Sequence, residues 1–367
     1  MSCRSDKLRI EFAPMEGITG YPFRFAFRDR FGGIDRFYTP FLSVSQSLGF
    51  GRHERRELDT GEDDKNMVPT VPQLLVKRGE ELAWGIEELI RLNRRDVNIN
   101  LGCPSPTVYK RGRGSGMLID PPAIDRMLDG AFEILESHGI GPDDFNLSVK
   151  MRIGMYDTSK LHETAEIINR YPVSYVIVHP RLGIQGYSGE PDLNAYGMAL
   201  EYFNIPVLYN GDIRSVEDHD MIMNRFPDTA GLMIGRGLLE DPFLAEKIES
   251  HVSGIRWSDN DDISRLESFT EKLYSNYLSY MNGNVRNALS RMKEYWSHLA
   301  DGPYLTYDLV SSESSKGAWG SNRLLSNDMK RLLKKLKKAV TYEEYEGAAL
   351  GIFELMRGKK LPVSGIF

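Results

Sequence analysis

Cysteine is nearly absent from this sequence of 367 residues. Its two cysteines, Cys3 and Cys103, are too few for a disulfide framework and cannot alone form a cysteine-based zinc site, so we expect a reducing compartment and no metal. No apolar run approaches the ~20 residues that span a bilayer. The N-terminal MSCRSDKLRIEF also lacks the apolar stretch of a signal peptide. The sequence therefore predicts a cytoplasmic protein that does not enter a membrane. We also expect a monomer.

A strong charge of one sign is also lacking. The chain has 46 Lys and Arg against 52 Asp and Glu, a net charge of −6, which argues weakly against a nucleic-acid partner. The charge is unevenly spread, however. Residues 251–367 hold 17 basic and 14 acidic residues, whereas the first 250 hold 29 and 38. The C-terminal part is therefore mildly basic, and whole-chain charge hides this difference.

Short apolar runs alternate with longer amphipathic stretches up to about residue 250, a pattern typical of parallel strands joined by helices. Eight strands are predicted, at 8–13, 34–40, 70–76, 97–101, 146–151, 174–179, 205–209 and 230–234, and Pro72 weakens the third because it has no N–H to donate. Helices are predicted at 21–30, 79–93, 121–137, 159–170, 192–203, 214–225 and 238–250. Segment 41–69 is predicted as loop, with a charged surface excursion at 53–66.

Eight such units in about 250 residues match a closed (β/α)₈ barrel of the TIM type, an α/β fold. An open doubly wound sheet is the alternative, but the first strand ends in APMEG and no GxGxxG fingerprint follows it. We therefore predict a barrel domain over 1–252. Residues 263–300 and 323–357 are each predicted as helix, which gives a smaller all-helical domain over 253–367.

Polar groups stand where the predicted strands end, and chemistry in such barrels takes place at the carboxyl ends of the strands. Asn210-Gly211-Asp212 and Gly235-Arg236 follow the last two strands, the usual phosphate site of the fold, which favours a phosphate-bearing ligand over two ordinary turns. Lys150 and His179 end adjacent strands. A cation beside a histidine suits an electron-rich ring that gains negative charge, such as a flavin.

Cys103 lies in the loop after the fourth strand, between Gly102 and Pro104. A thiol on such a loop suits a nucleophile or a proton donor, although free cysteines are often only small buried residues. The following segment, with Lys110, Arg111 and Arg113, is a basic, glycine-rich loop. It either closes over a polyanionic substrate or is a solvated loop.

The helix predicted around 329–340 carries six basic residues beside a leucine stripe. This face either binds RNA phosphates or is a solvated lysine surface.

Six motifs in order make this sequence resemble the dihydrouridine synthase family, over about residues 8–300. They are APMEGIT (13–19), NINLGCPS (98–105) followed by GSGML (114–118), VKMRIG (149–154), IVHPR (177–181), YNGDI (209–213) and MIGRGLLEDP (233–242). The resemblance implies an FMN-bound barrel that uses NADPH to reduce the C5–C6 double bond of a uridine in folded RNA, most simply tRNA. Such a base must leave its stack to be reached.

The resemblance also assigns roles to individual residues. Cys103 is implied as the general acid that protonates C5. Contacts to FMN are implied for Pro14, Met15, Gln73, Lys150, His179, Asn210, Gly211, Asp212, Gly235 and Arg236. Contacts to the RNA are implied for Asn100, Arg152, Arg181, Gln185 and Tyr187.

Three alternatives stay open: the same chemistry on ribosomal RNA, a flavin oxidoreductase acting on a small molecule, and a non-catalytic RNA-binding scaffold.

Overall fold

The computed structural model describes residues 9–58, 68–258, 261–308 and 323–358. Every strand predicted from the sequence is present, and all pair in parallel within one sheet. The strands are β1 (Ile10–Phe12), β2 (Arg36–Tyr38), β4 (Thr70–Val71), β5 (Gln73–Leu75), β6 (Asp96–Leu101), β7 (Asn146–Arg152), β8 (Val173–His179), β9 (Val207–Tyr209) and β10 (Gly231–Ile234), with the additional short β3 (Leu42–Ser43) beside β5.

Pro72 divides the third predicted strand into β4 and β5, as its missing N–H led us to expect. β4 pairs with β2, and β5 pairs with β6. Pro72 still contributes its carbonyl, which accepts a hydrogen bond from the N–H of Asn98 at 2.9 Å. Neighbouring strands pair from β5 through β6, β7, β8, β9, β10, β1 and β2 to β4. Pro72 alone separates β4 from β5 in the chain, and this link completes the ring of strands. The strands form a (β/α)₈ barrel, which confirms the predicted fold class.

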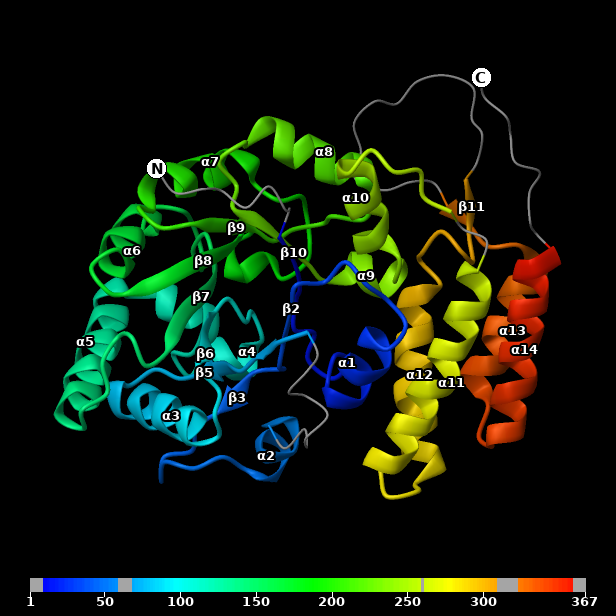
Figure 1. The fold of residues 1–367 in the computed structure, drawn as a ribbon, viewed down its shortest axis with the longest axis horizontal. Coiled ribbons are helices and arrows are strands. Elements are labelled where there is room, and N and C mark those ends of the chain that lie inside the picture. Colours follow the sequence, from blue (N-terminus) through cyan, green and yellow to red (C-terminus); the bar gives the residue numbers. More distant parts are fainter. Residues whose placement is uncertain (1–8, 59–67, 259–260, 309–322, 359–367) are drawn as a thin grey trace. The chain divides into compact units, whose positions relative to one another are not determined.

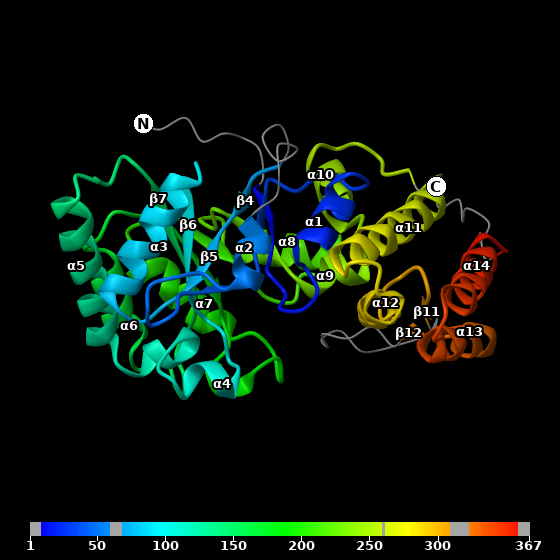
Figure 2. The same ribbon diagram turned by 90° about the horizontal axis from the view of Figure 1, so that it is seen from below.

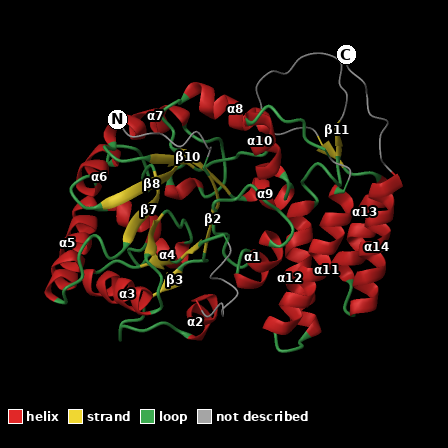
Figure 3. Ribbon diagram, viewed as in Figure 1, coloured by secondary structure: helices red, strands yellow, loops and turns green. Residues whose placement is uncertain are grey.

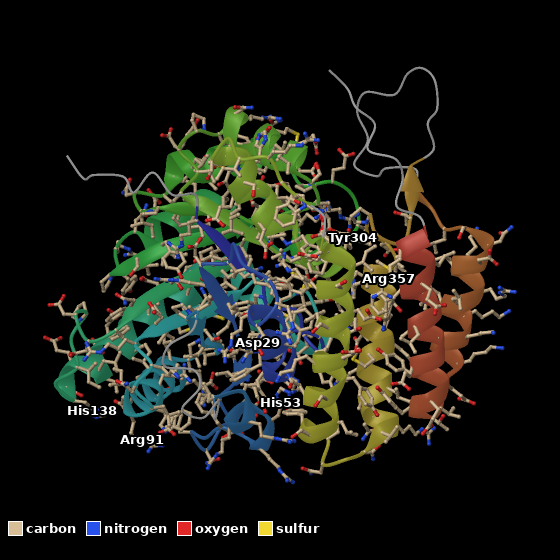
Figure 4. The ribbon with its side chains drawn as sticks, turned by 45° about the vertical axis from the view of Figure 1, so that its right-hand side comes forward. Asp29, His53, Arg91, His138, Tyr304 and Arg357 are labelled. Atoms are coloured by element: carbon tan, nitrogen blue, oxygen red, sulfur yellow. The ribbon has the colours of Figure 1, made fainter. Side chains whose placement is uncertain are left out.

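Helices cover the outside of the strands, as Figures 1 and 3 show. They are α3 (Gly79–Arg91), α5 (Pro121–Ser137), α6 (Leu161–Ile168), α7 (Leu193–Tyr202) and α8 (Val216–Arg225). Figure 2 shows α3, α5 and α6 along the outer side of β5 to β7. Solvent-facing side chains such as Arg91 and His138, labelled in Figure 4, belong to this outer layer. The barrel interior is therefore the place to look for buried polar groups.

The amino-terminal end of the barrel is closed by a buried polar network. The Tyr38 hydroxyl donates to Glu11 Oε2 at 2.7 Å and lies 2.8 Å from the Tyr175 hydroxyl, which accepts from Arg36 at 3.1 Å. Arg9 pairs with Glu11 and lies over the Tyr175 ring. Every member has a partner, so this end holds the strands together and leaves chemistry to the other end.

Two compact units divide the chain. The first comprises the residues up to Glu16 with Ile34–Ile213 and Glu217–Gly235, and contains all the strands of the parallel sheet. The second comprises Gly17–Gly33, Arg214–Val216 and the residues from Arg236 onward. Its helices are α1 (Tyr21–Arg28), α9 (Arg236–Glu240), α10 (Leu244–Val252), α11 (Asp262–Tyr280), α12 (Val285–Leu299), α13 (Asn327–Lys338) and α14 (Tyr342–Gly358), with a small antiparallel pair β11 (Tyr307–Asp308) and β12 (Arg323–Leu324).

Three predicted long helices are wrong as single elements. The predicted helix at 263–300 is α11 and α12, separated where Asn282 and Gly283 adopt positive φ. The predicted helix at 323–357 is α13 and α14, and that at 238–250 is α9 and α10 with Pro242 between them. Segment 41–69 also contains a helix, α2 (Arg52–Leu58), that its charged sequence did not indicate. Residues 59–66 of the predicted excursion, and Cys3, lie outside the described residues.

Candidate active site at the carboxyl end of the barrel

Strand alternation brings the predicted polar residues into the barrel interior. Gln73 stands opposite Asn98 in the strand register, Asn100 opposite Lys150, and Arg152 opposite His179. Residues two apart on a strand share a face, so these side chains line the same interior above an apolar layer. That layer consists of Ala13, Tyr38, Val71, Tyr175, Ile177, Leu208 and Met233.

A chain of buried amides leads across this interior to Cys103. Asn98 Nδ2 donates to Ser148 Oγ at 2.9 Å, and Gln73 Nε2 donates to Asn98 Oδ1 at 2.8 Å. Asn100 Nδ2 donates to Gln73 Oε1 at 2.7 Å. Asn100 Oδ1 then accepts from the backbone N–H of Cys103 at 2.8 Å. Asn100 therefore fixes the start of the cysteine loop, and three strands hold Asn100.

The Cys103 thiol is half-buried, and its pKa is raised. Burial is the largest cause. The backbone N–H of Ser105 acts in the opposite direction, the Glu16 carboxylate raises the pKa further, and Lys150 and Arg152 lower it. The net result keeps the sulfur protonated at neutral pH. Such a thiol is a proton donor rather than a thiolate nucleophile.

The ammonium of Lys150 lies in the same interior, and no counter-ion accompanies it among the described residues. This half-buried ammonium has no hydrogen-bond or ion-pair partner among the residues that the structure describes. Desolvation lowers its pKa to about 8, Arg152 adds to the decrease, and Cys103 opposes it. The ammonium is still mostly protonated at pH 7. A desolvated cation of this kind suits an electron-rich ligand.

Arg152 joins two loops at the mouth of the barrel. Its Nε donates to the Gly102 carbonyl at 3.0 Å, and its Nη1 donates to the Leu182 carbonyl at 2.8 Å. The guanidinium also lies 5.8 Å from the ring centroid of Tyr187, which is 52% exposed. Arg152 thus connects the cysteine loop after β6 to the loop after β8, where Tyr187 presents an aromatic face to solvent.

Arg181 organises the ends of β8 and β9. It is buried, forms an ion pair with Asp212, and places Nη1 3.2 Å from His179 Nε2. A guanidinium can only donate, so His179 Nε2 accepts and the imidazole proton is on Nδ1. Gln185 Oε1 accepts from the Leu182 N–H at 2.6 Å, which shapes the same loop. The side chains of Arg181 and Gln185 are thus engaged within the protein.

The loops after β9 and β10 carry the predicted phosphate residues. Asn210 Nδ2 donates to the Met233 carbonyl at 2.8 Å, which ties the two strand ends together. A Cβ at Gly235 would lie 3.4 Å from Met15 Sδ, so the β10 loop adjoins the half-buried Pro14-Met15 segment after β1. Arg236, next in the chain, begins α9 in the second unit.

Asn98 and Ser148 were missed as site residues in the sequence. Both lie on the same strand face as predicted neighbours, Asn98 two residues before Asn100 and Ser148 two residues before Lys150. Strict alternation along the two strands could have found them. Among the described residues, no group of three or more His, Cys, Asp or Glu could hold a metal, and no helix is long and apolar enough to cross a membrane.

Comparison with known proteins identifies the family. The model of the dihydrouridine synthase family matches residues 11–321. A relative from Cupriavidus necator, named tRNA-dihydrouridine(16) synthase, is 28% identical over 80% of this chain and 90% of its own length. Relatives of the same name from Haemophilus ducreyi and Neisseria meningitidis serogroup B are 31% and 27% identical, over 68% and 79% of this chain and 76% and 85% of their own. The chain therefore belongs to the dihydrouridine synthase family.

Proposed function

We propose that this protein reduces a uridine of folded tRNA to dihydrouridine, with FMN as its bound cofactor and NADPH as the reductant. The target position that we propose is 16, the position in the names of the relatives from three genera. The observation that carries the proposal is the position of Cys103, whose backbone N–H is held by Asn100, next to Lys150 on the neighbouring strand, whose ammonium has no counter-ion among the described residues.

The interior of the barrel fits a flavin. The Lys150 ammonium is the group that such a ring would engage, because it is desolvated and has no counter-ion in the described part of the chain. Pro14 and Met15 follow β1 and His179 ends β8, whereas Gln73 begins β5 and reaches the same interior through its hydrogen bond to Asn100. When bound, FMN would supply the hydride that is added to C6 of the base.

The ribityl phosphate is assigned to the loops after the last two strands. Asn210, Gly211 and Gly235 offer backbone close to the strand ends, and Arg236 offers positive charge. Asp212 acts here through Arg181, because its carboxylate pairs with that guanidinium. The Asp212 carboxylate orients the Arg181 guanidinium and does not itself contact the phosphate, because both groups are negatively charged.

Cys103 supplies the proton. Its S–H breaks as a C–H bond forms at C5, and the sulfur keeps the electron pair as a thiolate. The thiolate then regains a proton from solvent, which the half-exposed side chain can reach. The raised pKa of Cys103 makes this recovery favourable at neutral pH.

The substrate side is assigned to the loops that Arg152 joins. Tyr187 offers an exposed ring 6.4 Å from the ring of His179, centroid to centroid, and a base taken out of its stack needs such a surface. Asn100 and Arg152 hold the cysteine loop in place for that base. Arg181 and Gln185 hold the loop that carries Tyr187.

The C-terminal helical part, residues 253–367, is assigned to RNA binding. The six basic side chains of α13 are all exposed, whereas Met329, Leu333 and Leu336 are buried. A helix with a buried apolar stripe and an outward basic face suits the phosphate backbone of an RNA.

The test is to map dihydrouridine in cellular tRNA and ribosomal RNA with and without this gene, alongside the flavin content of the purified protein. We expect FMN in the protein and loss of dihydrouridine at tRNA position 16. Loss of dihydrouridine at another tRNA position would correct the target position and leave the proposed reaction on tRNA unchanged. Loss confined to ribosomal RNA, or an unchanged RNA pattern with turnover of free pyrimidines or enones, would contradict the proposal.

A further inference from the structure

A groove of about 840 Å³, lined mainly by polar and charged residues, lies beside the loop that begins at Cys103. Its walls come from segment 43–54, from Lys77 and Arg78 after β5, from Glu81 of α3, and from Arg111 and Arg113 after α4 (Pro106–Tyr109). All of these residues belong to the first unit. In Figure 4, His53 marks α2, the helix that contributes Glu54 to the wall.

The groove is basic, and part of its charge is held rigidly. The Glu81 carboxylate is buried and accepts from the Lys77 N–H at 3.0 Å, from Arg78 Nε at 3.1 Å and from Arg113 Nη2 at 2.9 Å. Arg113, only 19% exposed, also donates to the Val44 carbonyl. Glu81 thus holds the guanidinium groups of Arg78 and Arg113 in the wall. The basic residues that line the groove outnumber its two glutamates.

Other cations of the groove remain available to a ligand. Arg111 is exposed, and its side chain has no partner among the described residues. Lys77 is also exposed, and its Nζ donates to the Arg111 carbonyl at 3.0 Å, which leaves two further N–H donors. Ser43, Ser45 and Gln46 add neutral polar groups to the wall.

The basic loop is connected to Cys103 at both of its ends. It leaves from Cys103 and returns to it, because the Cys103 carbonyl accepts from Ser115 N at 3.1 Å and from Ser115 Oγ at 2.9 Å. Gly114, at φ +56°, leaves no room at this crossing, since a Cβ there would lie 2.9 Å from the Cys103 carbonyl oxygen. A ligand bound at the tip of this loop is therefore kept at a fixed position relative to Cys103.

We propose that this groove binds backbone phosphates of the RNA next to the uridine that is reduced. The proposal rests on the proposed function, which places an RNA at the same carboxyl edge of the barrel. Guanidinium and ammonium groups suit phosphate oxygens, and such contacts fix the register of an RNA without reading its bases. No aromatic residue is among the twelve that line the groove, so it offers no stacking surface for the adenine or nicotinamide ring of NADPH.

Arg78→Ala and Arg91→Ala form a matched pair of variants. Each arginine pairs with a glutamate three residues away, Arg78 with Glu81 and Arg91 with Glu88, but only Arg78 lines the groove. Arg111→Ala is a second groove variant, and it removes no side-chain hydrogen bond or ion pair within the described residues. The measurements are tRNA affinity against salt concentration, dihydrouridine formation, and the rate at which NADPH reduces the flavin, all with the full-length holoprotein.

We expect Arg78→Ala and Arg111→Ala each to weaken tRNA binding several-fold and to reduce the slope of log affinity against log salt by about 1. NADPH reduction of the flavin should stay unchanged in both, and Arg91→Ala should match the wild type. If the wild type forms dihydrouridine but the groove variants bind tRNA as tightly as Arg91→Ala does, the proposal is overturned. Slower flavin reduction with intact tRNA binding would also overturn it and assign the groove to NADPH. A wild type that forms no dihydrouridine would instead refute the proposed function.

Discussion

At the scale of single residues, the site depends on groups whose charge is set by burial. Cys103 stays protonated although Lys150 and Arg152 are near, because burial outweighs both cations. Lys150 keeps its proton at neutral pH despite a lowered pKa. The sequence placed Lys150 at a strand end and Cys103 in the loop after a strand, but no sequence pattern gives the desolvation that decides their protonation. Alternation along the strands could have placed Asn98 and Ser148 in the interior, but the hydrogen bonds that link Ser148 to Asn100 depend on the register between strands, which the sequence does not give.

The pKa of Lys150 predicts a pH dependence of FMN binding. The ammonium is mostly charged at pH 7 and loses its proton as the pH rises through about 8. We expect FMN affinity to weaken about fivefold between pH 8 and pH 9, because the fraction of charged lysine falls by that factor. Fluorescence titration of the apoprotein with FMN at each pH measures this.

Lys150→Arg is the control for that titration, since a guanidinium stays charged over the whole range. Its FMN affinity should vary less above pH 8 than that of the wild type. Identical pH profiles for the two proteins would show that Lys150 does not contact the flavin.

At the scale of elements, the barrel was predictable and the helical part less so. Each strand carries an apolar run between turn residues, and β6 pairs with β7 along the whole of β6. The break between α11 and α12 was missed, although Asn282 and Gly283 are suited to the positive φ found there. Helix α2 was missed because its sequence, RHERREL, has almost no apolar periodicity.

The cysteine loop gives a prediction for Gly114 and Gly112. Both have positive φ, +56° and +68°, so alanine at either should destabilise the fold by about 1–2 kcal/mol. A Cβ at Gly114 would press on Cys103, whereas nothing lies within 4 Å of one at Gly112. We expect the larger loss in thermal stability in Gly114→Ala, which adds this close contact to the backbone strain, and slower dihydrouridine formation only in Gly114→Ala. Equal turnover of the two variants would show that the loop does not position Cys103.

At the scale of the whole molecule, the overall net charge of −6 conceals a basic surface that the sequence did locate. The cations of α13 are exposed, as the spacing of its leucines predicted. The domain boundary at residue 252 stays a prediction, since the second compact unit also includes Gly17–Gly33 and residues from Arg236 onward. Assignment of α1, α9 and α10 to that unit depends on tertiary contacts, which a strand–helix pattern does not contain.

The basic face of α13 predicts a salt-dependent contribution to RNA affinity. The double variant Lys334→Gln with Lys338→Gln should lower the slope of log affinity against log salt by up to about 2. Its binding makes fewer phosphate contacts and therefore releases fewer counterions from the RNA. Arg91→Gln with Arg126→Gln, two exposed cations of the outer barrel helices, is the matched control. Filter binding of tRNA from 50 to 300 mM salt (roughly the range over which counterion release is resolved) measures both. An unchanged slope in the α13 variant would assign that face to solvent alone.

The role of Cys103 as the proton donor is tested most directly by a single turnover of the reduced holoprotein with unmodified tRNA, comparing the wild type with Cys103→Ala. The flavin should be reduced by NADPH at the same rate in both proteins, because the thiol takes no part in that step. Transfer to uridine should fall about 10²–10⁴-fold in Cys103→Ala, the usual contribution of a general acid. Formation of dihydrouridine by Cys103→Ala at the wild-type rate would contradict the account.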